Sequence, residues 1–178
     1  MSTKDELLLV VDEHDRPIEP LPRRIVHTSG AWHRVVHIWV VNGSGEILCQ
    51  QRSLAKDLNP GWWEACFGGH VVPGEEYLGA ALRELREELG LAVRPAELKF
   101  WKVYQHRSVR HANNEFQAVF VLRWGGDPSL LTFSDGEVEQ VAWKPAAEVR
   151  ERIASHAAQW VGVSYEPELI DEMGWVKA

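Results

Sequence analysis

The feature that most constrains the fold is a leucine stripe within residues 75–89. Leu78, Ala81, Leu82, Leu85 and Leu89 recur at the three- and four-residue spacing of a helix with one apolar face. Gly90 follows directly, at the position where a helix C-cap glycine is expected. The pattern therefore predicts an amphipathic helix over about 75–89 that must pack against another apolar surface.

Segments with strand character lie on both sides of this helix. Apolar runs cover 7–11, 33–42, 46–52, 97–105, 115–124 and 139–143, and further helices are expected after Pro145 and Pro167. This order predicts an α/β (α+β) fold, a sandwich built on a mixed β-sheet. We expect one domain over residues 1–178, with a C-terminal helical extension over about 145–178.

Bulk composition excludes several classes of protein. The 178 residues are 45% hydrophobic, which suffices for a core, and the formal net charge of −7 argues against nucleic-acid or membrane partners recruited by positive charge. We see no apolar run of about 20 residues and no signal-peptide pattern at the N-terminus. Two cysteines, Cys49 and Cys66, form no disulfide framework, so we expect a cytoplasmic location.

The polar side of the predicted helix carries a cluster of carboxylates. At about 100° per residue, Glu84, Glu87 and Glu88 fall within a wedge of roughly 100° beside the leucines. Such like charges repel one another, but clustered carboxylate oxygens suit Mg²⁺, which completes its shell with water and substrate phosphates. A solvated acidic face is the alternative reading of these residues.

The residues around the cluster favour the metal. Reading from Gly69, the segment GHVVPGEEYLGAALRELREELGL resembles the Nudix box over 69–91 at every fixed position. Those positions are Gly69, Glu75, Arg83, Glu84, Leu85, Glu87, Glu88, Gly90 and Leu91.

The resemblance implies a fold, a reaction and residue roles. It implies a Nudix α/β/α sandwich with a loop–helix–loop motif, and Mg²⁺- or Mn²⁺-dependent attack of water on a diphosphate bond. Glu84, Glu87 and Glu88 would bind the metal and Gly69 would let its backbone approach it. Glu75 would brace the loop, and Arg83 would hold the glutamates.

The likeness extends over roughly residues 5–145, to the Nudix branch of isopentenyl-diphosphate isomerase and its hydrolase-like relatives. It rests on segments such as VVDEHDRPI, HTSGAWHRVVHIWVV and NNEFQAVF. It implies a second site for Zn²⁺ or Mn²⁺ at His27, His33, His70 and Glu115, with Asn113 at a fifth ligand position. Glu115 could instead be the general base, as could Glu88. Arg52 and Lys56 fall where the isomerase grips its diphosphate.

One departure separates this chain from the isomerase. The isomerase needs a cysteine at position 68, where this chain has Gly68, and Cys66 would lie roughly 6.6 Å away along a strand. The box glutamates are complete, so we expect hydrolysis of a nucleoside diphosphate derivative or related organic diphosphate. Isomerase activity, or a non-catalytic nucleotide-binding module, is the alternative.

The sequence leaves the substrate open. Most of the nine tryptophans are expected in the core, with Trp62, beside the glycine loop, the first candidate to contact substrate. The expected partner is a small-molecule diphosphate. The stretch from about Glu151 could cover the site or build a homodimer.

Overall fold

The computed structural model describes residues 6–56, 58–108, 112–134, 136–162 and 165–174. Its strands are β1 (Leu7–Leu8), β2 (Leu21–Pro22), β3 (Trp32–Val41), β4 (Glu46–Arg52), β5 (Trp63–Glu64), β6 (Leu98–Ser108), β7 (Asn113–Arg123) and β8 (Val138–Pro145). Its helices are α1 (Arg23–Ser29), α2 (Tyr77–Leu89), α3 (Ala146–Ala154) and α4 (Glu166–Glu172), with 3₁₀ turns η2 (Pro95–Glu97) and η3 (Pro128–Leu130).

The main sheet is mixed, as the element order predicted. Its strands follow the order β5-β4-β3-β7-β6, and β8 also pairs with β4. β3 and β7 run parallel through ten register pairs, from Trp32↔Asn114 to Val41↔Arg123, while the other pairs of this sheet are antiparallel. β1 and β2 form a separate two-stranded sheet.

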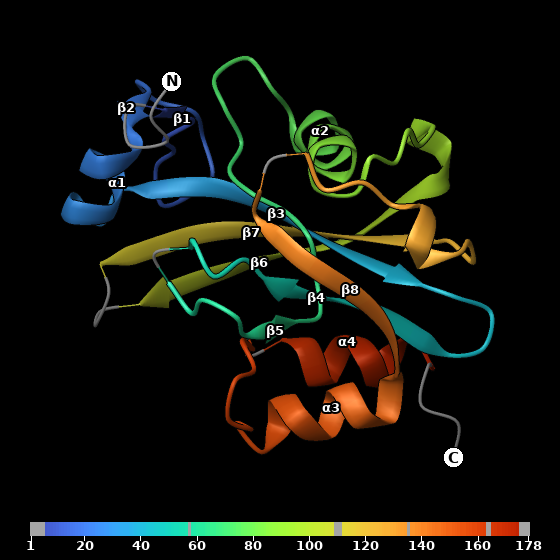
Figure 1. Ribbon diagram of the computed structural model, residues 1–178. Coiled ribbons are helices and arrows are strands. Elements are labelled where there is room, and N and C mark those ends of the chain that lie inside the picture. Colours follow the sequence, from blue (N-terminus) through green and yellow to red (C-terminus); the bar gives the residue numbers. More distant parts are fainter. Residues whose placement is uncertain (1–5, 57, 109–111, 135, 163–164, 175–178) are drawn as a thin grey trace.

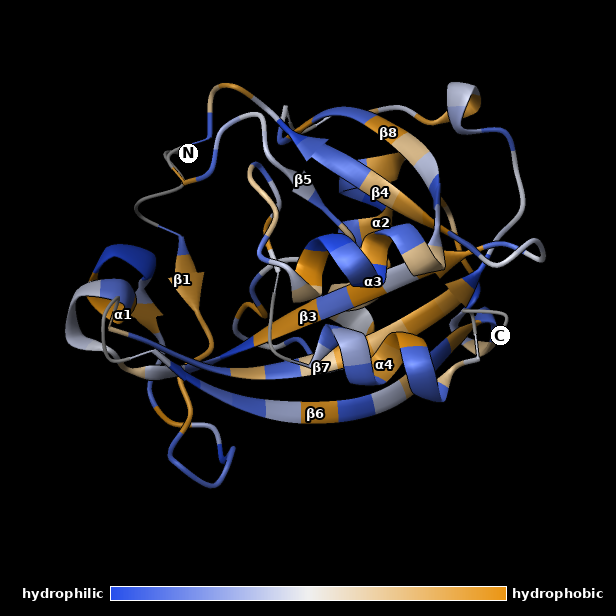
Figure 2. Ribbon diagram, turned by 90° about the horizontal axis from the view of Figure 1, so that it is seen from below, coloured by the Kyte–Doolittle hydropathy of each residue, from blue (hydrophilic) through white to orange (hydrophobic). Residues whose placement is uncertain are grey.

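Helices cover both faces of the main sheet, which confirms the sandwich (Figure 1). Val36, Ile38 and Val40 of β3 join one buried cluster with α2, whereas Trp39 and Val41 join a second cluster with α3 and α4. This division follows from the alternation of side chains along a strand. Seen from below, α3 and α4 cross in front of the long strands (Figure 2).

The segment 67–71 is inserted between β3 and β4. β3 and β4 share only the register pair Val41↔Ile47, and beyond it the backbone of β3 bonds to this segment instead. The Ile38 amide donates to the Phe67 carbonyl at 2.7 Å, and the Val36 amide donates to the Gly69 carbonyl at 2.9 Å. These backbone hydrogen bonds hold the loop that precedes α2 against the central strand, β3.

α2 matches the predicted helix, with one exception in its apolar face. Ala81, Leu85 and Leu89 are fully buried, and the backbone of Gly90 is left-handed at φ 68°, as a C-cap requires. Leu78 was expected to be buried with them but is 37% exposed. It lies in the first turn of the helix, next to Tyr77.

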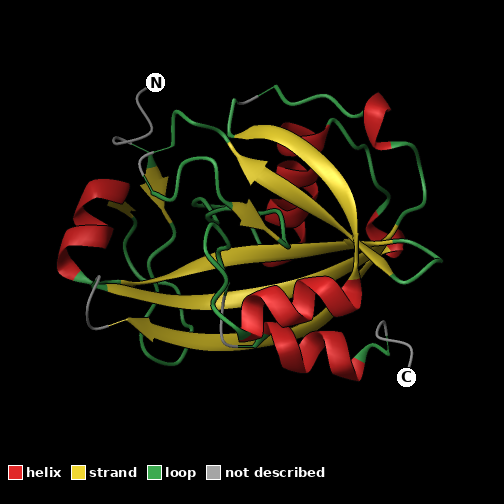
Figure 3. Ribbon diagram, turned by 60° about the horizontal axis from the view of Figure 1, so that its bottom comes forward, coloured by secondary structure: helices red, strands yellow, loops and turns green. Residues whose placement is uncertain are grey.

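Short elements depart most from expectation. The apolar run 7–11 forms only the two-residue strand β1 and isolated bridges at Val10 and Val11. α1, at one end of the long strands (Figure 3), was not anticipated. None of the described helices is long and apolar enough to cross a bilayer.

Burial on α2 predicts unequal costs for two leucine truncations. Leu85→Ala should lower the free energy of unfolding by about 2–5 kcal/mol, because it leaves a cavity in the cluster that α2 shares with the sheet. Leu82→Ala, at a half-buried position one turn away, is the matched control and should cost clearly less. Urea denaturation measures both, and equal losses would contradict the assigned face of the helix.

Candidate active site

Arg83 is the hub of the predicted catalytic helix. Its guanidinium donates to both oxygens of Glu75 at 2.9 and 3.1 Å, to Glu84 at 2.8 Å and to Glu87 at 2.9 Å. It also donates to the His70 carbonyl at 2.9 Å. One cation therefore ties three carboxylates of the helix and loop to the backbone of the glycine segment.

The other glutamates lie directly on that backbone. The Gly68 amide donates to Glu88 at 2.9 Å, and the Glu84 carboxylate lies where a side chain at position 69 would begin, 2.4 Å from an idealised Cβ. A side chain at position 69 would displace the Glu84 carboxylate from its present position. The Gly69 carbonyl itself accepts the Val36 amide.

Burial changes the titration of Glu84. It raises the pKa of this carboxyl to about 7, against the opposing effect of Arg83 and with the help of Glu87. Glu84, Glu87 and Glu88 are not gathered around a common point among the described residues, since Arg83 lies between the first two. A cation binding here would have to draw the carboxylates together.

The three predicted histidines do meet. α1 supplies His27, β3 supplies His33 and the inserted segment supplies His70, and one ring nitrogen of each lies within 4.8 Å of the others. His27 Nε2 and His70 Nε2 are 3.2 Å apart. Burial lowers the pKa of all three rings, which favours the neutral form that binds a metal.

Glu115 lies beside this cluster, as its position on β7 opposite His33 requires. Its Oε1 is 3.8 Å from His33 Nε2. Asn113 donates to Oε1 at 2.6 Å and Gln117 donates to Oε2 at 2.8 Å. Burial acts to raise the pKa of Glu115, but these amide bonds and the nearby His37 and His33 hold it below its usual value.

The donor set fits a bound cation. His33 Nδ1 lies 3.1 Å from the Ala31 carbonyl, so a proton on Nδ1 leaves the lone pair of Nε2 facing the cluster. Within the described residues, His33 Nε2 and Asn113 Oδ1 are buried without a hydrogen-bond partner. Three neutral imidazoles and a carboxylate suit Zn²⁺ or Mn²⁺, and a metal would satisfy these atoms.

The predicted substrate cations are already paired. Arg52 donates to Glu64 at 2.8 Å and to the Leu58 carbonyl at 3.2 Å, and Lys56 forms an ion pair with Glu137. Trp62 is half-buried in the loop before β5. Among the described tryptophans, Trp39 and Trp160 are buried in the core. Four more are partly buried and pack against it, so most of the described tryptophans belong to the core, as expected: Trp63, Trp101, Trp124 and Trp143.

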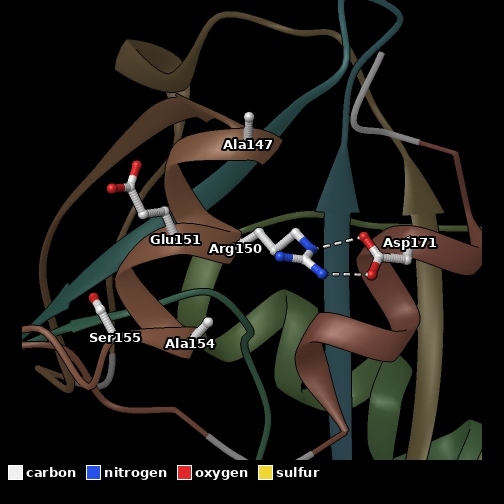
Figure 4. A pocket seen from close by; sticks show the side chains of 6 residues that line it. All are labelled: Ala147, Arg150, Glu151, Ala154, Ser155 and Asp171. Carbon is white, nitrogen blue, oxygen red and sulfur yellow. Dashed lines mark hydrogen bonds and ion pairs between the residues drawn. The ribbon is translucent and has the colours of Figure 1, made fainter. Parts of the chain in front are cut away.

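Two surface hollows in the described part of the chain lie away from the histidines and the box glutamates. One of about 580 Å³ is lined by α3 and the end of α4, where Arg150 and Asp171 form a two-bond ion pair at 2.7 and 2.8 Å (Figure 4). The other, of about 370 Å³, includes Arg52 but not Trp62. Neither hollow is lined by a histidine or a box glutamate.

His37 is a polar residue of this sheet face that the sequence analysis missed. It lies four residues beyond His33 on β3, and its Nδ1 is 2.6 Å from the Tyr165 hydroxyl. Tyr165 in turn stacks on Tyr104, with ring centroids 4.5 Å apart. The spacing of His33 and His37 on one predicted strand was the available signal, since i and i+4 share a face.

Partly buried His37 predicts a loss of stability in acid. Burial lowers its pKa, helped by His106 and opposed by Glu115 and Glu64, so the folded protein keeps it neutral while the unfolded chain binds a proton below about pH 6.5. Stability should therefore fall as pH drops from 6.5 to 5, and His37→Gln should flatten this slope by up to about 1.4 kcal/mol per pH unit.

Urea titrations of the metal-free protein at several pH values measure that slope. His14→Gln, at an exposed side chain, is the control and should leave it unchanged. The same slope in wild type and His37→Gln would contradict the neutral state of His37 in the folded protein.

Comparison with known proteins agrees with this geometry. The NUDIX domain family matches residues 31–162. A Nudix hydrolase of Streptomyces coelicolor is 34% identical over 86% of this chain and 82% of that protein. An isopentenyl-diphosphate Delta-isomerase of Paenarthrobacter aurescens is 32% identical over 93% of this chain and 91% of that protein. A Nudix hydrolase of Pseudomonas aeruginosa is 44% identical, but over only 48% of this chain and 51% of that protein.

Solved structures show the same fold. A crystal structure from Deinococcus radiodurans superimposes with a TM-score of 0.71 and 25% identity, covering 94% of this chain and 98% of the other. The Nudix domain of a Shewanella oneidensis protein, solved with ADP ribose, gives a TM-score of 0.58 at 16% identity over 79% of this chain and 84% of the other. The chain therefore belongs to the Nudix family, in the branch that also contains isopentenyl-diphosphate isomerases.

Proposed function

We propose that this Nudix enzyme hydrolyses a diphosphate bond of a nucleoside diphosphate derivative or related organic diphosphate, using Mg²⁺ or Mn²⁺. One observation carries the proposal: the box glutamates gather at the backbone of Gly68 and Gly69. Arg83 binds Glu75, Glu84 and Glu87, and the Gly68 amide donates to Glu88. A purely structural helix gains nothing from so many carboxylates around one cation.

Each residue has a task in this proposal. Glu84, Glu87 and Glu88 hold the divalent ion, Arg83 and Glu75 position them, and Leu85 and Gly90 fix the helix that carries them. The bound ion would lower the pKa of an attacking water and neutralise charge on the phosphoryl group. Glu84, half-protonated near neutral pH without metal, would lose its proton on binding a cation.

Glu115 and Glu88 are the candidate general bases. Glu115 lies beside the histidine cluster, whereas Glu88 is buried and accepts the Gly68 amide. Arg52 and Lys56 would exchange their present carboxylate partners, Glu64 and Glu137, for substrate oxygens. Trp62 would stack against the organic part. We also propose that His27, His33, His70 and Glu115 hold a second ion, Zn²⁺ or Mn²⁺.

The first test is phosphate release with Mg²⁺ or Mn²⁺ across nucleoside di- and triphosphates, nucleotide sugars, dinucleotides and isopentenyl diphosphate. Glu87→Gln should lower turnover by roughly 10²-fold or more, because a neutral amide replaces a charged ligand while the fold is kept. Glu76→Gln, an exposed neighbour at the start of α2, is the matched control and should retain wild-type turnover. An unchanged rate in Glu87→Gln would refute the proposal.

Isomerase activity is the second candidate, favoured by the relatives of that name. The backbone at position 68 argues against it. Gly68 has φ 146°, and a Cβ there would lie 1.9 Å from the Val36 carbonyl oxygen, so β3 leaves no room for a side chain. Cys66, the nearby thiol, is buried, and burial raises its pKa well above the usual value.

This crowding predicts that one substitution does not create an isomerase. Gly68→Cys should destabilise the protein by more than about 1 kcal/mol and give no conversion of isopentenyl to dimethylallyl diphosphate. Gly79→Cys, on the open surface of α2, controls for the added thiol and should leave both the fold and that assay unaffected. A stable, isomerising Gly68→Cys protein would restore the alternative.

A further inference from the structure

The second metal site raises a question about Asn113, whose amide belongs to the histidine cluster. Its nitrogen donates to Glu115 Oε1 at 2.6 Å, which fixes the orientation of the amide. Its oxygen is buried without a hydrogen-bond partner in the described part of the chain. A carbonyl oxygen kept out of water and unpaired costs free energy unless a cation or donor meets it.

The position of Asn113 relative to the rings is consistent with a shared ion. His33 Nε2 is the other buried atom of this cluster without a hydrogen-bond partner among the described residues. It lies 3.8 Å from Glu115 Oε1, the oxygen that Asn113 contacts. The Asn113 side chain also interacts with His27, and this interaction acts to raise the pKa of His27 against the larger effect of burial. The amide thus stands between the carboxylate and the imidazoles.

The charge of this donor set has a chemical consequence. It contains three neutral rings, one carboxylate and one neutral amide, so its formal charge is −1. A divalent ion would bring the centre to +1. With a second carboxylate in place of the amide, the loaded centre would be neutral. A buried centre with excess positive charge attracts anionic oxygen strongly.

We propose that Asn113 supplies its side-chain oxygen to the ion held by His27, His33, His70 and Glu115, and that this single-carboxylate centre binds an anionic oxygen of the diphosphate substrate. The inference rests on the proposed second metal site. It gives that site a function in anion binding, separate from the carboxylates of α2.

The test uses full-length protein in a Glu87→Gln background, so that hydrolysis does not interfere. Zn²⁺ affinity is measured by competition with a chromophoric chelator, and inorganic pyrophosphate binding to the Zn²⁺-loaded protein is measured by calorimetry. Asn113→Asp keeps the shape and replaces only the amide NH₂ by a charged oxygen. It should tighten Zn²⁺ and weaken pyrophosphate, each on the order of tenfold. These opposite signs distinguish the proposal from a general loss of structure.

Two further variants complete the design. Asn113→Leu removes the oxygen and should weaken Zn²⁺ by roughly 10- to 100-fold. Asn114→Asp adds the same charge one residue along, where the side chain points away to the Gly30 carbonyl, and should change neither affinity. Metal-free melting curves establish that each variant folds.

The outcomes separate the two proposals. Unchanged Zn²⁺ affinity in Asn113→Leu, or pyrophosphate affinity that does not fall in Asn113→Asp, would overturn the inference and leave the hydrolase proposal intact. Equal effects of Asn113→Asp and Asn114→Asp would also overturn it. Opposite shifts in Zn²⁺ and pyrophosphate affinity, together with no hydrolysis of any diphosphate by the protein that retains Glu87, would support the inference and reject the hydrolase proposal.

Discussion

The site depends on one guanidinium, that of Arg83. Carboxylates at Glu75, Glu84 and Glu87 would repel one another in a half-buried loop, and Glu84 resists ionisation even with Arg83 beside it. Burial works against the charge of Arg83, yet the carboxylates more than compensate and raise its pKa. Without the arginine the charges of these glutamates would be left uncompensated, so the glutamates and Arg83 depend on one another.

The same arginine fixes the loop to the helix. Its bond to the His70 carbonyl anchors the segment that lies between β3 and β4. At the start of the helix a second arginine, Arg34, bonds to Asp15 at 2.7 Å and lies over the ring of Tyr77. Asp15 also accepts the Tyr77 hydroxyl. Arg34 therefore holds the first turn of α2 against the sheet, and Arg83 ties the middle of the helix to the segment between β3 and β4.

Much of this arrangement could be predicted from local pattern. α2 and the strands β3, β4, β6, β7 and β8 follow from periodicity, and Gly90 marks the end of the helix. α1 could not be anticipated, because a helix of seven residues carries too short a pattern, so the element that supplies His27 was not predicted. Leu78 shows that helical spacing identifies a face but not where the covering surface ends.

Contacts between distant segments were beyond sequence reasoning in a different way. The family resemblance put His33 and Glu115 together, but the parallel register of β3 and β7 is what does so physically. The pairing of Arg52 with Glu64 and of Lys56 with Glu137 has no local signature at all. Neither has the fit of Gly68 under the Val36 carbonyl, which depends on the separation of two backbones.

His70 belongs to both halves of the site. Its ring is part of the histidine cluster, while its carbonyl accepts a bond from the arginine that restrains Glu84 and Glu87. An ion that binds Glu84 and Glu87 would pull them away from Arg83, and Arg83 is the residue that donates to the His70 carbonyl. An ion bound by the imidazole of His70 would shift the same residue from its other side. By thermodynamic reciprocity, any effect of one ion on the affinity of the other is returned in equal measure. Two ions bound here would load as a coupled pair, and a single dissociation constant would describe neither.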